Sequence, residues 1–148
     1  MTRRSTTRTA AAVVATLLGA GLLGGCGGDS PYCAAVKENQ SALDSFGTKV
    51  SDKTFAREAR AVRAIAATDP AKVGDDWTAI DKAMRRVLSA QKKTGLTFAD
   101  LNDPEQRADA DSGDLETVTK AYGVFNDTAQ QRKAVVEDVA TTCDVSLA

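Results

Sequence analysis

The sequence contains no histidine, and its 148 residues include only three cysteines, three prolines and one tryptophan. The lack of histidine excludes the Ser-His and Cys-His nucleophile arrangements, the Glu-x-x-His di-iron pattern and histidine-ligated zinc or copper. No phosphate-binding loop and no nucleic-acid-binding motif occurs. We therefore predict a protein that is not an enzyme, with no catalytic residue, no metal, no cofactor and no nucleic-acid partner.

Charge is scarce at the N-terminus. Arg3, Arg4 and Arg8 are the only charged residues before Cys26, so the rest of the chain holds 16 basic and 20 acidic residues. The part after Cys26 therefore has a net charge of about −4 at neutral pH. Its length suits one small domain with one hydrophobic core.

The N-terminal segment reads as a secretory signal. A basic head is followed by the apolar stretch Ala10–Leu23 and then by small residues. The sequence Leu23-Gly24-Gly25-Cys26 resembles the lipobox of bacterial lipoproteins. That resemblance implies cleavage before Cys26 and a diacylglycerol on its thiol.

Two other interpretations of this segment are an ordinary cleaved signal and an uncleaved membrane helix. A spanning helix needs about 20 apolar residues, whereas this run is shorter and interrupted by glycines. The Arg3-Arg4 pair is typical of twin-arginine signals, but Ser5-Thr6-Thr7 replaces their hydrophobic pair, which favours the general secretion route. We predict a cleaved lipoprotein signal peptide (1–25), a lipid-anchored tether (26–31) and an extracytoplasmic domain (32–148) held at the cell membrane.

With Cys26 taken by lipid, Cys33 and Cys143 remain. An exported domain with two cysteines most simply forms one disulfide. Neither cysteine lies in a Cys-x-x-Cys motif, which disfavours a redox role, and two free thiols would require a reducing compartment. In the chain-entropy model, closing a loop of about 110 residues contributes about 4–5 kcal/mol.

The remaining sequence predicts helices. Each proline follows a good N-cap residue, in Ser30-Pro31, Asp69-Pro70 and Asp103-Pro104, so three helices should begin there, and Ser51 should cap another. The first helix should end near Gly47 and the helix from Pro70 should end at Gly95. Apolar residues spaced by three and four support each helix. They are Tyr32, Val36, Leu43, Phe46 and Val50; Phe55, Ala59, Val62, Ile65 and Ala66; Val73, Trp77, Ile80, Met84, Val87 and Leu88, with Gln91 continuing the same face; and Leu115, Val118, Tyr122, Phe125, Ala129, Val136, Val139 and Cys143.

The last of these sets keeps one phase throughout, which predicts one long final helix, with a possible kink near Gly123 or Asn126. No segment alternates with period two, so a sheet is not expected. We predict an all-α fold: an antiparallel four-helix bundle tied by one disulfide between the first and last helices. The segment from Leu96 to Gly113 is expected to be an irregular connection, with a short extra turn from Pro104.

The tether from Cys26 to Cys33 spans at most roughly 24 Å. The bundle should therefore sit against the membrane with its disulfide end toward the lipid. A partner would first meet the connections between the first and second helices and between the third and fourth.

Arg57, Arg60 and Arg63, together with Arg85 and Arg86, could form a basic surface for anionic lipid headgroups or wall polymers; the alternative is an ordinary solvated face. The segment from Asp109 to Glu116 looks like a calcium loop, but it lacks the required order of glycine and aspartate and has Lys120 in place of the final glutamate.

Trp77 and Tyr122, with Phe125, could line a cavity for a lipid or small apolar ligand, the alternative being core packing. The acidic pairs Asp75-Asp76 and Glu137-Asp138 are poor general acid–base dyads, because neighbours on a helix point about 100° apart.

The lipobox, the opening Pro31-Tyr32-Cys33 and the closing Cys143-Asp144-Val145 together resemble small helical lipoproteins of high-GC Gram-positive bacteria. That resemblance implies location and fold, and it carries no catalytic residue. We predict a membrane-anchored helical module that binds another envelope protein. The alternative is a carrier of a lipid or small hydrophobic ligand in the bundle interior. The oligomeric state stays open.

Overall fold

A computed structural model of the chain describes residues 29–44, 46 and 51–147. The predicted signal peptide (1–25), its cleavage residues Leu23, Gly24 and Gly25, and the lipidation residue Cys26 lie outside these residues. Within them the fold is all-helical, with seven helices and no strand. The helices are α1 (Pro31–Leu43), α2 (Asp52–Ala66), α3 (Gly74–Thr94), α4 (Phe98–Asn102), α5 (Pro104–Asp109), α6 (Ser112–Asn126) and α7 (Ala129–Cys143).

Most of the predicted helix boundaries are confirmed. Ser30 caps α1 by accepting the Cys33 N–H, with Pro31 as the first helical residue. Ser51 caps α2 through a reciprocal pair of hydrogen bonds with Thr54. At the other end of α3, Gly95 adopts the left-handed conformation (φ +76°) that favours glycine. These capping residues are found at the predicted positions because each one allows a hydrogen bond to a backbone group that the helix end leaves unpaired.

The predicted start of the third helix at Pro70 is wrong. Residues 70–73 form turns, and α3 begins at Gly74. Asp69 has a left-handed φ of +47°, which turns the chain before the proline instead of capping a helix. A Cβ at position 74 would lie 2.8 Å from the Asp69 Oδ1 atom, so a larger residue there would force the Asp69 side chain to move.

The single long final helix is also wrong, because the chain breaks after Asn126 into α6 and α7. The Phe125 carbonyl accepts the Thr128 N–H (3.0 Å), the Thr128 hydroxyl (2.7 Å) and the Arg132 guanidinium (3.2 Å). The guanidinium also lies 4.5 Å from the centre of the Phe125 ring. Side-chain donors thus take up an acceptor that a continuous helix would use. The break lies next to the kink position predicted at Asn126.

The segment expected to be irregular, Leu96 to Gly113, holds the two short helices α4 and α5. Thr97 caps α4 in a reciprocal pair with Asp100, and Asp103 caps α5 at the predicted Asp103-Pro104 start. Asp111 caps the following α6 through the N–H groups of Gly113 and Asp114. The acidic residues that resembled a calcium loop therefore include a helix cap.

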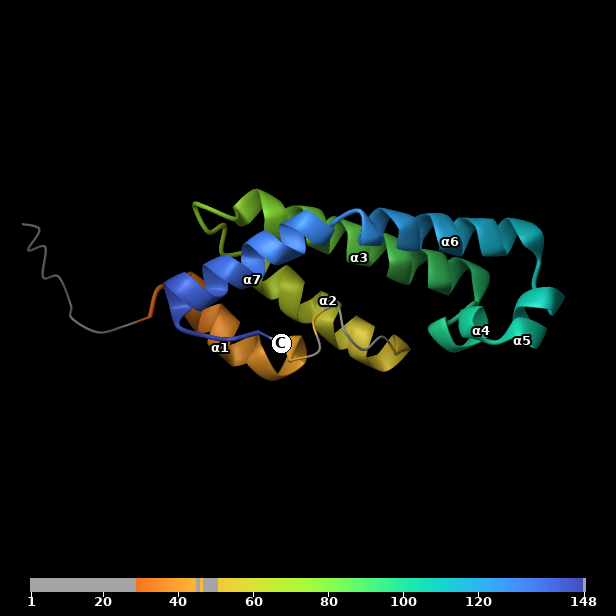
Figure 1. Cartoon of the computed structure of the whole chain (residues 1–148), viewed down its shortest axis with the longest axis horizontal. Coiled ribbons are helices and arrows are strands. Elements are labelled where there is room, and N and C mark those ends of the chain that lie inside the picture. The colour runs from red at the N-terminus through yellow and green to blue at the C-terminus, as the bar shows by residue number, and fades with distance from the viewer. Residues whose placement is uncertain (1–28, 45, 47–50, 148) are drawn as a thin grey trace, which may run out of the picture.

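Helix α3 is the centre of the packing (Figure 1). It contacts α2 along one side and both α6 and α7 along the other, while α1 contacts α2 and α7. The small helices α4 and α5 lie at the end remote from the disulfide. With 21 residues, α3 is about 31 Å long and runs between these two ends. The side chains with less than 2% exposure are Trp77, Phe55, Leu43, Ile65, Ile80, Met84, Val36, Val62, Val87, Val118, Val135 and Val139.

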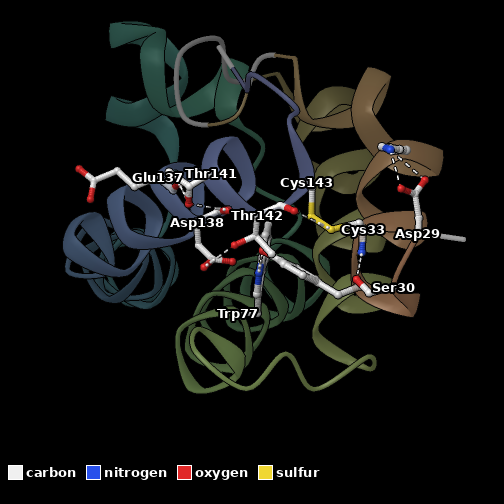
Figure 2. The surroundings of a disulfide bond; sticks show 11 residues. Asp29, Ser30, Cys33, Trp77, Glu137, Asp138, Thr141, Thr142 and Cys143 are labelled. Atoms are coloured by element: carbon white, nitrogen blue, oxygen red, sulfur yellow. Dashed lines mark hydrogen bonds and ion pairs between the residues drawn. A yellow bond between two sulfur atoms is a disulfide. The ribbon is translucent and has the colours of Figure 1, made fainter. Parts of the chain in front are cut away.

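The predicted disulfide between Cys33 and Cys143 is confirmed, and it links the first turn of α1 to the last residue of α7 (Figure 2). Both cysteines are buried, as are Val145 and Leu147 beyond α7. Across the described residues, no helix has the length and apolar character needed to cross a bilayer. The bundle is closed covalently at the end where Asp29 and Ser30 lead into α1.

We expect the Cys33→Ala/Cys143→Ala double variant to be less stable by up to about 4–5 kcal/mol, because the bridge restricts the unfolded chain. Chemical denaturation followed by Trp77 fluorescence measures this loss, since Trp77 is the single tryptophan and is fully buried. An exposed substitution on the same helix, Glu38→Ala, serves as the control and should change stability little. Equal denaturation midpoints for the double variant and the parent would contradict the expectation.

Candidate functional site

We call the end of the bundle opposite the disulfide the distal end: α4, α5 and the adjoining ends of α2, α3 and α6. Four aromatic rings hold it together. Phe55 of α2 makes edge contacts with Phe98 of α4 (5.4 Å between ring centres) and Phe125 of α6 (5.2 Å). The Phe98 ring also lies 4.5 Å from the ring of Tyr122. Such pairs add to the energy of apolar burial, and they fix α4 against α2 and α6.

A polar cluster lies beside these rings. The Asp52 Oδ1 atom accepts hydrogen bonds from the Gln91 side-chain amide (2.6 Å) and from the Phe98 N–H (3.0 Å). The same amide donates to the Tyr122 hydroxyl (2.9 Å). Burial, and secondarily the charge of Asp52, raises the pKa of Tyr122 far above its usual value, so the hydroxyl stays neutral. One carboxylate therefore connects α2, α3 and α4, and through Gln91 also α6.

Sequence reasoning placed Gln91 on an apolar stripe and missed this cluster. The sequence signal for the cluster was the polar residue Gln91 at the end of an apolar stripe, which in the structure contacts the first turn of α2. A half-buried amide needs hydrogen-bond partners, but the identity of the partner depends on how the helices pack. Asp52 lies in the first turn of α2, where an acidic residue is also favoured by the helix dipole.

An open groove of about 470 Å³ lies at the distal end, lined by Leu101, Arg107, Leu115, Thr119 and Tyr122. Both leucines and Tyr122 are half-buried, so apolar surface is accessible there. This groove includes Tyr122, one of the two aromatic residues predicted to contact a ligand. Its lining is mainly apolar with a single positive charge.

The surroundings of this groove are strongly acidic. From Leu96 to Glu116 the chain has seven acidic residues and one basic residue, Arg107. Asp103 and Asp111 cap helices, and Asp100 accepts from the Thr97 hydroxyl and N–H, which lowers the pKa of Asp100. Glu105, Asp109 and Glu116 are exposed and differ in their contacts: within the described chain their side chains have no hydrogen-bond or ion-pair partner. These three carboxylates are available to a partner.

Trp77, the other predicted ligand contact, lies elsewhere. Its side chain is 0% exposed, and its indole N–H donates to the Tyr32 hydroxyl (3.3 Å) near the disulfide (Figure 2). Burial raises the pKa of Tyr32 to about 12. Trp77 is in the first turn of α3, whereas Gln91, which contacts Tyr122, is 14 residues further, about 21 Å along the helix. The structure therefore does not bring Trp77 and Tyr122 together, and Trp77 lines none of the four grooves described on the bundle.

The predicted basic surface divides into two parts. Arg63 of α2 and Arg85 of α3 both lie beside buried Asp81, with nitrogen–oxygen distances of 3.6 and 2.8 Å. Arg57 and Arg60 are exposed on α2. Arg86 does not join them: it lines a separate groove between α3 and α6. Adjacent residues on a helix point about 100° apart, which explains the separation of Arg85 from Arg86.

No protein family, curated protein or solved structure matches the chain.

Replacing Asp52 with alanine should loosen α4, because the Phe98 N–H and the Gln91 amide would lose their common acceptor. We expect a loss of about 1–3 kcal/mol in stability and faster amide hydrogen exchange at Phe98. Glu38→Ala is the matched control, since it removes an exposed acid without a structural contact. Unchanged exchange at Phe98 in the Asp52 variant would rule out the role assigned to this carboxylate.

Proposed function

We propose that the protein is a lipid-anchored, extracytoplasmic module of the cell envelope that binds another envelope protein through its distal end. Cys26 carries the lipid, and residues 26–31 tether the bundle to the membrane. The lipobox resemblance supports the anchor, and the disulfide supports a compartment outside the cytoplasm, where such bonds persist. Two or three acyl chains hold a protein firmly at a membrane, whereas one does not.

The position of the tether favours the distal end as the binding surface. Asp29 and Ser30 enter the bundle at the disulfide end, where Asp29 forms an ion pair with Lys37 of α1 (2.7 Å). Helix α3 separates this end from α4 by about 31 Å. A partner arriving from outside the membrane therefore meets α4, α5 and the start of α6 first.

We also propose that the helices act as an antiparallel four-helix bundle in which α6 and α7 together form the fourth member. The packing supports this arrangement, because α6 and α7 cover successive parts of the same side of α3. Helix α7 then returns to α1 and closes the bundle at the disulfide.

The observation that carries the proposal is the separation of charge. The segment from Leu96 to Glu116, which forms most of the distal end, has an excess of six negative charges, although the chain after Cys26 has a net charge of only about −4. An acidic rim around an apolar groove suits a partner with basic residues flanking an apolar side chain, because opposite charges speed encounter and fix orientation. Apolar contact in the groove then supplies affinity.

We expect Cys26→Ala to release the protein from the membrane, because it removes the lipid acceptor. Membrane fractionation and the intact mass of the N-terminal peptide measure this in cells that express the full chain. Glu38→Gln, with an unaltered lipobox, should stay in the membrane fraction. A parent protein with an unmodified Cys26 thiol would contradict the anchor.

Neutralising the exposed distal acids should prevent partner binding. We expect the triple variant Glu105→Gln/Asp109→Asn/Glu116→Gln to lose at least about 90% of a cross-link formed from a photoreactive residue at position 108 on α5. That loss corresponds to about tenfold weaker binding, or 1.4 kcal/mol. The control triple Glu38→Gln/Asp44→Asn/Asp127→Asn removes the same charge elsewhere and should keep the cross-link.

A photoreactive residue at position 140, exposed on α7, tests the location. It should give no adduct of the same mass. An identical adduct from positions 108 and 140, or equal loss in both triple variants, would contradict distal binding.

A further inference from the structure

A second groove lies between α3 and α6, away from the distal apolar groove. Its volume is about 350 Å³, and its polar lining is Arg86, Ser89 and Lys93 from α3 with Thr117 and Lys120 from α6. Ala90 and Ala121 form its floor. Small residues at the floor allow the two helices to approach, and the long cationic side chains stand on either side.

All charged residues of this lining are positive. Within the described part of the chain, Arg86, Lys93 and Lys120 form no ion pair, whereas Arg63 and Arg85 share the carboxylate of Asp81. Like charges near one another on helices destabilise the fold unless a counter-charge is present. Asp81 supplies that counter-charge for Arg63 and Arg85, whereas no carboxylate of the described residues lies within ion-pair distance of the three cations of this groove.

The cations are arranged as a row. Arg86, Ser89 and Lys93 recur at intervals of three and four, so they share one face of α3. Arg86 and Lys93 are seven residues apart, about 10 Å along the helix axis. Lys120 faces them from α6. The Thr117 hydroxyl donates to the Gly113 carbonyl (2.8 Å), which leaves the Ser89 hydroxyl as the neutral donor of the lining.

Helix-end electrostatics explains only part of this row. Lys93 is in the last turn of α3, where a cation is favoured by the helix dipole. Arg86 lies two turns earlier and Lys120 lies in the middle of α6, where that effect has faded. A need for solubility does not explain the row either, since the chain after Cys26 already has 16 basic and 20 acidic side chains.

We propose that this groove binds a polyanion with several phosphate groups in a row, such as a polyphosphate or phosphodiester chain. Arginine forms paired hydrogen bonds with phosphate oxygens, and lysine contributes a point charge. A chain of phosphates can contact cations spread over about 10 Å along the helix at the same time, whereas a single phosphate would have to draw the flexible ends of Arg86 and Lys93 together. The proposal does not depend on a protein partner at the distal end, because it uses a different groove.

The test is calorimetric titration of inorganic tripolyphosphate into the full chain in non-ionic detergent. We expect binding that weakens with added salt and that becomes at least tenfold weaker in the triple variant Arg86→Gln/Lys93→Gln/Lys120→Gln. All three side chains are exposed, so the variant should fold, and circular dichroism checks this.

The matched control is Lys53→Gln/Arg57→Gln/Arg60→Gln, which removes the same charge from exposed positions on α2 with similar helical spacing. It should retain the affinity of the parent. A second titration uses glycerol phosphate, which represents a single lipid headgroup. Absence of tripolyphosphate binding, equal loss in both variants, or glycerol phosphate binding as tightly as tripolyphosphate would each overturn the proposal.

Discussion

The packing of α3 against three other long helices is the constraint on which the fold depends. Its buried side chains, among them Trp77, Ile80, Met84 and Val87, face α2 on one side and α6 and α7 on the other. Burying an apolar side chain contributes about 1.5–3 kcal/mol, so this one helix organises much of the stabilising energy. The disulfide adds a covalent closure at one end, and the aromatic rings around Phe55 close the other.

Local chemistry made much of this fold predictable. Cap residues such as Ser30, Ser51 and Asp103 satisfy backbone groups within three residues of themselves, so their effect can be read directly from the sequence. The cysteine pair was predictable because, once Cys26 is assigned to lipid, one pairing is possible. The same reasoning failed at Asp69-Pro70, where Asp69 has a left-handed backbone conformation and Pro70 belongs to a turn. The fixed φ of proline is compatible with both a turn and the first turn of a helix, so proline alone does not distinguish them.

Long-range contacts were not predictable, and both candidate sites depend on them. Periodicity showed that Arg86, Lys120 and Tyr122 lie on helices, but not which helices are neighbours. The pairing of α3 with α6 places Arg86 beside Lys120 and separates it from Arg85. Likewise, Trp77 and Tyr122 both belong to apolar stripes, yet they lie near opposite ends of α3. The apolar residues before and after Asn126 keep the same helical spacing, so the sequence pattern did not reveal the break between α6 and α7.

That break limits how far the covalent constraint reaches. The disulfide fixes the C-terminal end of α7, while α6 is connected to α7 through Asp127 and Thr128 and is held mainly by its contacts with α3. The half of the bundle near the cysteines is therefore restrained covalently, and the distal half is held by packing alone. Opening of the distal half breaks only non-covalent contacts, whereas the disulfide stays intact when the other half opens. Both grooves lie on the distal half, so a bound ligand that restricts its motion also pays the entropic cost of that restriction.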